Sequence, residues 1–222
     1  DPAHAPHKKL EKLQGVLAQC HRILVHAPDD LNRLKALGLV DNVALFPHGI
    51  RDYTPLVNAD PRCPKASTNV GFTIASYGFF LPHKGLLELI EAVALLRKAG
   101  QNVRLHLVNA EYPAPESAAE IEKVRKKISE LDLSEYVRMT TDFLSDDESL
   151  SLLAAADLIV FPYRNTVESA SGAVRYGLAT GRPVAVTPLS IFDDVASAAY
   201  TLPGMTPAQI AQGIRQLLPE IA

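Results

Sequence analysis

The sequence predicts an α/β fold, in which a doubly wound parallel sheet is covered by helices on both faces. Strand-like and helix-like segments alternate along the whole chain, which is the pattern of a parallel sheet with helical crossovers. The run Leu158-Ile159-Val160-Phe161 is continuously apolar, as expected for a strand buried on both faces. The stretch Ser145-Asp-Asp-Glu148 has the form of a capping box, which marks the start of a helix.

Composition indicates an ordinary globular protein and excludes several other classes. The chain has 222 residues, of which 47% are hydrophobic, and this content argues against disorder. Its 22 basic and 25 acidic residues are spread along the chain and give a net charge of −3, so no basic surface for nucleic acid is expected. No apolar run approaches about 18 residues, and no signal peptide opens the chain. We therefore expect a cytoplasmic protein, with a peripheral position at the inner membrane face as an alternative.

Two further features bear on metal binding and on completeness. Cys20 and Cys63 do not share a metal-ligand spacing, and the adjacent pairs Asp146-Asp147 and Asp193-Asp194 do not form an Asp-x-Asp motif, so no metal site is predicted. The chain begins Asp1-Pro-Ala without a methionine, which suggests a fragment of a longer protein.

The first part of the chain predicts two helices and two strands. A helix is expected from about Lys9 to Cys20, followed by a short buried strand at Ile23-Leu24-Val25. Asp29 is expected to cap a second helix, which stops at Gly38. A second strand is expected from Val43 to Phe46.

A polar segment with two prolines, from about Val57 to Asn69, has the composition of a linker. Beyond it the pattern becomes regular. A strand from Val70 to Tyr77 leads to a helix from about Gly85 to Lys98, the alternation from Val103 to Leu107 predicts a strand, and an amphipathic helix follows Pro115.

The remaining elements continue the alternation. The capping box opens a helix, and the apolar strand at 158–161 follows it. A helix from about Ser169 to Thr180, a strand from Pro183 to Val186, and a final helix that opens at Thr206-Pro207 complete the expected fold.

In such a sheet, ligands bind outside the carboxyl ends of the strands, so the strand-to-helix loops are the candidate sites. The first loop runs from Ser76 to Gly85 and carries Lys84 at the mouth of a helix, where a full positive charge suits a diphosphate. The helix dipole disfavours a cation at the start of a helix. A lysine kept at this unfavourable position therefore indicates a functional role rather than a merely solvated side chain. His83 is more simply explained as an exposed loop histidine.

The second loop runs from Pro162 to Gly172. Glu168 could accept hydrogen bonds from sugar hydroxyls, while Ser169, Ser171 and the backbone N–H groups up to Gly172 could face phosphate oxygens. The alternative is that Glu168 only complements the helix dipole.

Read together, these loops resemble the C-terminal domain of the GT-B retaining glycosyltransferases of family 4. The matching stretches are Gly78 to Gly85, Ala156 to Pro162, and Glu168 through Gly181-Arg-Pro-Val184. The likeness also reaches back to Ile23-Leu-Val-His26 and Phe46-Pro-His-Gly49. The resemblance therefore implies a Rossmann-like donor domain over residues 58–222, preceded in residues 1–57 by the end of the acceptor-side domain and the crossover.

The resemblance implies roles for individual residues. Lys84 would neutralise the donor diphosphate, Glu168 would hold the transferred sugar, and these two are the expected catalytic residues. Phe143 lies where such enzymes pack the nucleobase. The full set expected to bind the donor is Gly78, Phe79, His83, Lys84, Asn109, Phe143, Tyr163, Glu168, Ser169, Ser171, Gly172 and Tyr176.

The sequence departs from the family pattern at three positions. Phe79 stands where the family has a diphosphate-binding arginine, and Tyr176 stands where a second glutamate usually holds the ribose. Asn109-Ala-Glu111 replaces a Gly-x-Gly after a strand, so the nucleotide preference does not transfer. Arg175 could supply the missing charge, but its place on the helix should point it elsewhere.

The function implied is sugar transfer from a nucleoside diphosphate donor, such as a GDP- or UDP-sugar, with retention and without a metal or other cofactor. The acceptor would be a glycan or a lipid-linked molecule of polysaccharide biosynthesis, held against an N-terminal domain that this chain lacks, so the fragment alone should be inactive. A GT-B sugar-nucleotide epimerase is a second hypothesis. A degenerate domain that serves in binding or assembly is a third, favoured by Phe79 and Tyr176.

Overall fold

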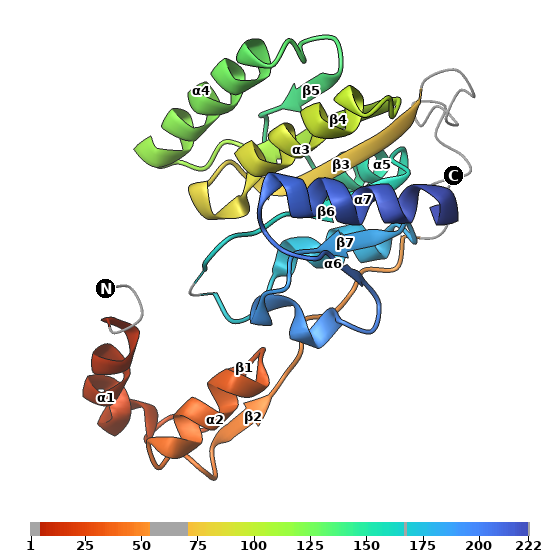
Figure 1. Ribbon diagram of the computed structural model, residues 1–222. Coiled ribbons are helices and arrows are strands. Elements are labelled where there is room, and N and C mark those ends of the chain that lie inside the picture. Colours follow the sequence, from red (N-terminus) through yellow and green to blue (C-terminus); the bar gives the residue numbers. More distant parts are fainter. Residues whose placement is uncertain (1–4, 54–70, 167, 222) are drawn as a thin grey trace.

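The computed structural model describes residues 5–53, 71–166 and 168–221, so the predicted linker lies outside the described residues. The N-terminal segment, red to orange in Figure 1, contains α1 (Ala5–Leu17), β1 (Ile23–Val25), α2 (Pro28–Ala36) and β2 (Val43–Leu45). The two strands pair in parallel, with Ile23 opposite Val43. This segment has a small core of its own, which consists of Val25, Leu34, Leu39 and Val43.

The predicted cap of the second helix is wrong by two residues. α2 begins at Pro28, and Ala27 occupies the cap position without a side-chain hydrogen bond. Proline fixes the backbone angle that the first helical residue needs and has no N–H to satisfy, so the helix can begin there. Asp29 therefore lies in the first turn, where its charge complements the helix dipole.

Among the described residues of the larger C-terminal part, six strands form one sheet in which every pair is parallel. Their spatial order is β5-β4-β3-β6-β7-β8, so the chain first adds strands on one side of β3 and then crosses to the other. This is the order of a Rossmann-like doubly wound sheet, and it confirms the predicted fold class. The strands are β3 (Phe72–Phe79), β4 (Val103–Ala110), β5 (Val137–Thr140), β6 (Leu158–Phe161), β7 (Val184–Val186) and β8 (Tyr200–Thr201).

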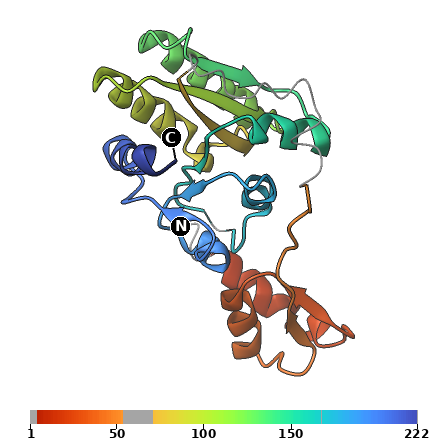
Figure 2. The ribbon, with the colours of Figure 1, turned by 90° about the vertical axis from the view of Figure 1, so that its right-hand side faces the viewer.

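Helices cover both faces of this sheet (Figures 1 and 2). On one face, α3 (Leu86–Lys98) packs against α4 (Pro115–Glu130) and α7 (Pro207–Ile221). On the other face lie α5 (Asp146–Ala154) and α6 (Gly172–Ala179), which contact each other, and the 3₁₀ turn η2 (Ser190–Val195). No helix in the described residues is both long and apolar enough to cross a membrane.

The predicted capping box is confirmed at the start of α5. The Ser145 hydroxyl accepts a hydrogen bond from the Glu148 N–H at 3.3 Å, and the Glu148 carboxylate accepts one from the Ser145 N–H at 3.0 Å. The start of α6 was predicted three residues too early. The Ser171 hydroxyl accepts a hydrogen bond from the Val174 N–H at 3.4 Å and so caps the helix, which leaves Ser169 and Ala170 in the preceding loop.

Candidate functional site

The candidate site lies where the winding of the sheet reverses. β3 is flanked by β4 on one side and by β6 on the other, and ligands of doubly wound proteins bind at the carboxyl ends of the strands beside such a switch point. A cleft of about 340 Å³ opens there. The loops that follow β3 and β6 both reach it, and so does the start of α6.

The structure brings most of the sequence-predicted donor residues together at this cleft. It is lined by nine of them, namely Gly78, Phe79, Lys84, Phe143, Tyr163, Glu168, Ser171, Gly172 and Tyr176. The other three, His83, Asn109 and Ser169, do not line it.

Lys84 is the buried charge of the site. It belongs to the 3₁₀ turn η1 (Pro82–Lys84), which joins β3 to α3, and only 7% of its surface is exposed. Its Nζ lies 3.1 Å from the Glu168 Oε2 and 4.0 Å from the centroid of the Tyr163 ring. A buried ammonium needs such partners because its transfer out of water is costly. Glu168 is half-exposed, so the carboxylate end of this ion pair faces solvent.

The backbone holds these two loops against each other. Gly85 has a φ of +68°, and a Cβ placed there would lie 1.9 Å from the carbonyl oxygen of Pro162. The Arg164 N–H donates a hydrogen bond to the His83 carbonyl at 2.8 Å. The position of Lys84 is therefore coupled to that of the loop that carries Glu168.

The start of α6 offers the other anion-binding element. Ser171 is buried, and its hydroxyl lies 3.4 Å from that of Tyr163. The first N–H groups of a helix have no partner within the helix, and they carry its positive dipole end. Gly172 and Ala173 are the first residues of α6 and line the cleft, so this end suits phosphate oxygens.

His83 precedes Lys84 in the turn η1 and does not line the cleft. Its ring packs edge-on against Tyr163, and its Nε2 lies 3.7 Å from the Glu168 Oε2. Burial lowers the pKa of His83 below its usual value, Lys84 lowers it further, and Glu168 opposes the shift. The imidazole is thus neutral at pH 7, and its buried Nε2 has no hydrogen-bond partner among the described residues.

Asn109 is buried at the end of β4. With the amide oriented to satisfy its neighbours, it donates to the Ser76 carbonyl at 3.2 Å and accepts from the Gly78 N–H at 3.3 Å. It therefore supports the backbone of β3 beside the cleft. Ser169 is partly exposed in the loop after β6.

An aromatic surface forms one end of the cleft. The ring centroid of Phe79 lies 6.1 Å from that of Phe143 with nearly parallel planes, and 5.1 Å from that of Tyr112 in an edge-on arrangement. Phe143 is 78% exposed, so one of its faces remains available to a flat ligand. This end suits the stacking of a nucleobase.

A tyrosine pair also lines the cleft. The rings of Tyr77 and Tyr176 stack with centroids 4.8 Å apart, and the Tyr176 hydroxyl donates to the Asp146 Oδ1 at 2.7 Å. This hydrogen bond, together with burial, raises the pKa of Tyr176 to about 12. Because the Tyr176 O–H donates to Asp146, the Tyr176 oxygen can take part in a further hydrogen bond only as an acceptor, for example from a ligand hydroxyl.

Sequence reasoning missed several residues of the cleft. Tyr77 lies within β3, and Ser149 lies on the buried face of α5. Ser149 lies outside the strand-to-helix loops, so a search of the loops does not find it, whereas Tyr77 was part of the searched stretch from Ser76 to Gly85 but was given no role there. Within residues 5–53, 71–166 and 168–221, no three His, Cys, Asp or Glu side chains gather where they could hold a metal ion.

Sequence comparison identifies the family. The profile described as glycosyl transferases group 1 matches residues 71–220, which is most of the chain. The chain belongs to the glycosyl transferases group 1 family. A comparison with curated proteins finds no match.

Solved structures of glycosyltransferases share the fold. HepE from Anabaena, solved in complex with UDP and glucose, is 16% identical with a TM-score of 0.76 over 98% of this chain and 59% of that chain. Sucrose-phosphate synthase from Thermosynechococcus elongatus is 17% identical with a TM-score of 0.72, over 93% of this chain and 51% of that one. A glycosyltransferase from Rickettsia africae is 16% identical with a TM-score of 0.77, over 94% and 57%. The chain thus spans a little over half the length of these three proteins, and its doubly wound sheet is that of a GT-B C-terminal domain.

Proposed function

We propose that residues 58–222 bind a nucleoside diphosphate sugar, and that the protein transfers the sugar to an acceptor with retention, as in family 4. The observation that carries this proposal is the buried Lys84 ammonium at the switch point of the sheet, paired at 3.1 Å with a solvent-facing glutamate. A buried cation beside a helix N-terminus suits a diphosphate, and a carboxylate beside it suits sugar hydroxyls.

In the proposed mechanism the protein acts by electrostatic stabilisation. Lys84 and the start of α6 stabilise the negative charge that develops on the diphosphate as its bond to the sugar breaks. When the donor binds, the ion pair between Glu168 and Lys84 opens and Lys84 contacts the diphosphate instead. Glu168 then orients the sugar, which carries positive charge in the transition state. No metal ion is required in this scheme, because Lys84 supplies the charge.

The lining of the cleft supports proposed positions for the base and the ribose of the donor. The base stacks on Phe143 beside Phe79, and the ribose lies near Tyr176. HepE was solved in complex with UDP-glucose, so a UDP-sugar is the first donor to test, with GDP-sugars next.

Residues 1–57 form the end of an acceptor-side domain and the crossover in this proposal. The acceptor is a glycan or a lipid-linked molecule of polysaccharide biosynthesis, bound on the cytoplasmic side.

One observation favours a second candidate, a degenerate domain that serves in binding or assembly. Phe79 occupies the place of an expected arginine and packs in the cleft against Phe143 and Tyr112, so one phosphate contact is absent. Failure to bind any nucleoside diphosphate would favour this candidate. Interconversion of the donor sugar without an acceptor would instead favour an epimerase.

The test is a calorimetric titration of the chain with UDP, GDP and ADP and with their sugar conjugates. We expect saturable binding of one base series and at least about tenfold weaker binding by Lys84→Ala, because a charge-assisted contact contributes roughly 1.5–3 kcal/mol. Lys98→Ala is the matched control, since Lys98 is exposed at the far end of α3. Equal affinities of the two variants would remove Lys84 from the proposed site.

A further inference from the structure

A second cavity lies beside the donor cleft, between residues 48–51 and α6. We call it the seam cavity, and its volume is about 280 Å³. Its polar lining consists of His48, Arg51, Asp146, Arg175 and Tyr176. It shares Gly172 and Tyr176 with the donor cleft, so the two cavities meet at the start of α6.

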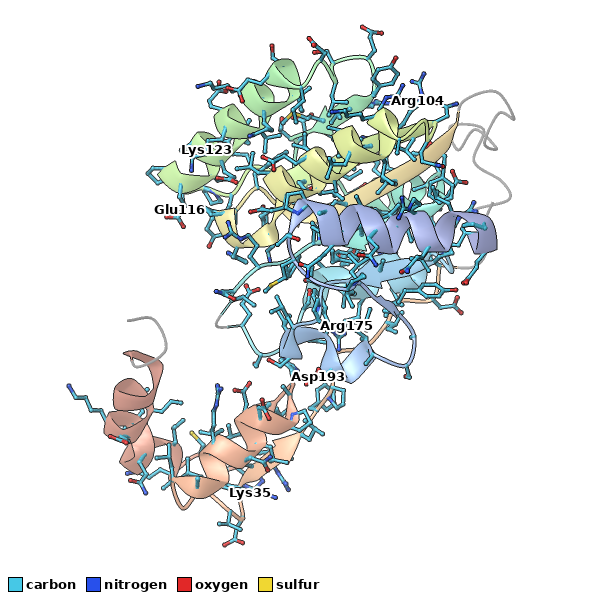
Figure 3. All side chains as sticks on the ribbon, viewed as in Figure 1. Lys35, Arg104, Glu116, Lys123, Arg175 and Asp193 are labelled. Carbon is cyan, nitrogen blue, oxygen red and sulfur yellow. The ribbon has the colours of Figure 1, made fainter. Side chains whose placement is uncertain are left out.

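Arg175 is the buried cation of the seam cavity. It projects from α6 and is only 6% exposed. One of its terminal nitrogens donates to the Ser171 carbonyl at 2.5 Å, and the other pairs with the carboxylate of Asp194. Figure 3 shows Arg175 next to η2, on the side of the sheet that faces the N-terminal segment.

The third nitrogen of this guanidinium is unsatisfied. Its Nε is buried and has no hydrogen-bond partner among the described residues. An unmade hydrogen bond of a buried donor costs roughly 1–3 kcal/mol, so such a group in a folded protein needs an explanation. Since Arg175 lines the seam cavity, an oxyanion held there is a candidate for the missing acceptor.

Two more basic side chains reach the same cavity. The His48 ring stacks on that of His26, with centroids 3.7 Å apart. Arg51 contacts Asp146 at 2.9 Å and Asp147 at 3.2 Å, but its side chain is half-exposed, and ion pairs of this kind contribute little to stability. Arg51 can therefore turn toward a ligand at small cost.

We propose that the seam cavity binds an oxyanion, a phosphate or carboxylate carried by the acceptor. The guanidinium of Arg175 provides the fixed donor, and His48 and Arg51 provide the adjustable ones. Assignment of the anion to the acceptor rests on the proposed function, since the donor's charge is met by Lys84 in the neighbouring cleft. Tyr176 and Gly172 line both the seam cavity and the donor cleft. An acceptor anion in the seam cavity would therefore lie next to the donor.

The pKa of His48 can report anion binding in the seam cavity, because this pKa responds to nearby charges. Burial lowers the pKa of His48 below its usual value, His26 and Arg175 lower it further, and Asp194 opposes the shift. A phosphate bound beside it favours the imidazolium and should raise this pKa. The His48 signal in an NMR spectrum is identified by its loss in His48→Ala.

The experiment is a titration of the chain with inorganic phosphate, followed by the His48 signal and by calorimetry. We expect saturable binding with an upward shift of the His48 pKa, and at least about tenfold weaker binding by Arg175→Gln. Arg51→Gln should also weaken binding, and since Arg51 is exposed, this variant keeps the test valid if Arg175→Gln does not fold. Arg104→Gln is the control, because Arg104 is exposed on β4 and lines neither cavity.

The source of the anion is decided by repeating the titration with a saturating nucleoside diphosphate. Phosphate binding should persist in the presence of the nucleotide and should be unchanged in Lys84→Ala. This result would support a separate acceptor site even if sugar transfer is never observed. Competition by the nucleotide, or loss in Lys84→Ala, would assign the phosphate to the donor cleft and overturn the proposal. Absence of any His48 response would overturn it as well.

Discussion

At the residue scale, Gly85 has two separate reasons to be glycine. Its φ of +68° is the left-handed conformation, which costs other residues about 1–2 kcal/mol. In addition, a Cβ would meet the Pro162 carbonyl oxygen at 1.9 Å, and this contact is with backbone, which cannot rotate away. Any side chain here must therefore push apart the loops that carry Lys84 and Glu168.

The first prediction compares Gly85→Ala with Gly100→Ala. Gly100 also has a positive φ, +82°, but no atom lies within 4 Å of its added Cβ. We expect Gly100→Ala to lower the free energy of unfolding by about 1 kcal/mol and Gly85→Ala by at least about 2 kcal/mol more, with weaker nucleotide binding. Urea denaturation measures both. Equal losses would show that the contact with Pro162 is relieved without cost.

Reasoning from the fold alone predicted the site only where its residues follow strands, and Tyr176, within α6, was named only through the family resemblance. Lys84 and Glu168 stand in strand-to-helix loops, and the carboxyl ends of β3 and β6 bring those loops together. The pairing of Arg175 with Asp194 was not predictable, because it joins α6 to a 3₁₀ turn whose position depends on packing. The hydrogen bond from Tyr176 to Asp146 is likewise a tertiary contact without a local signal.

At the scale of elements, the sheet partly buries a titratable side chain that bonds to the neighbouring strand. His106 of β4 lies 2.9 Å, through its Nε2, from the Thr140 hydroxyl of β5. Burial lowers the pKa of His106 to about 4, and Arg138 adds to the shift. The folded pKa is thus below the unfolded value of 6.5, so the unfolded chain binds the proton more readily.

The second prediction follows from this sign. The stability that depends on neutral His106 is fully present above pH 6.5 and is lost as the pH falls toward about 4. Between pH 7 and about pH 4.5, we expect the wild-type free energy of unfolding to fall by roughly 2 kcal/mol more than that of His106→Gln, which does not titrate. Denaturation at the two pH values checks this, and identical pH profiles would contradict it.

Element boundaries show where sequence patterns stop being informative. The strand after the linker was expected to end at Tyr77, yet β3 continues to Phe79 because it pairs with β4 along its whole length, up to Ala110. The glycine at 78 indicates a turn locally, but the ladder to a neighbouring strand decides the outcome. The parallel, doubly wound sheet, by contrast, was predicted from the alternation of strands and helices.

At the scale of the whole molecule, the N-terminal segment is tied to α5. Tyr53 is 3% exposed, packs against Leu150 and Ala154, and its hydroxyl lies 2.8 Å from that of Ser151. Arg51 adds its contacts to Asp146 and Asp147. These residues are far apart in sequence, so only the folded chain shows that the segment before the linker contacts the larger C-terminal part.

The last prediction concerns transfer itself. The chain spans 51% of the sucrose-phosphate synthase chain and 59% of HepE, so we expect it alone to bind the donor but to transfer little, and transfer should be measured in a longer protein that includes an acceptor domain. There, Glu168→Gln should reduce the rate by roughly 100-fold or more, because the amide cannot stabilise positive charge on the sugar.

The same variant should leave the affinity for the nucleoside diphosphate unchanged or higher, because the diphosphate has no sugar for Glu168 to hold and Lys84 is freed from its ion pair. Glu122→Gln, on the exposed face of α4, is the matched control for loss of a carboxylate. Near-normal turnover of Glu168→Gln would refute its proposed role. Loss of turnover together with loss of nucleotide binding would mean that Glu168 maintains the structure of the loop rather than acting on the sugar.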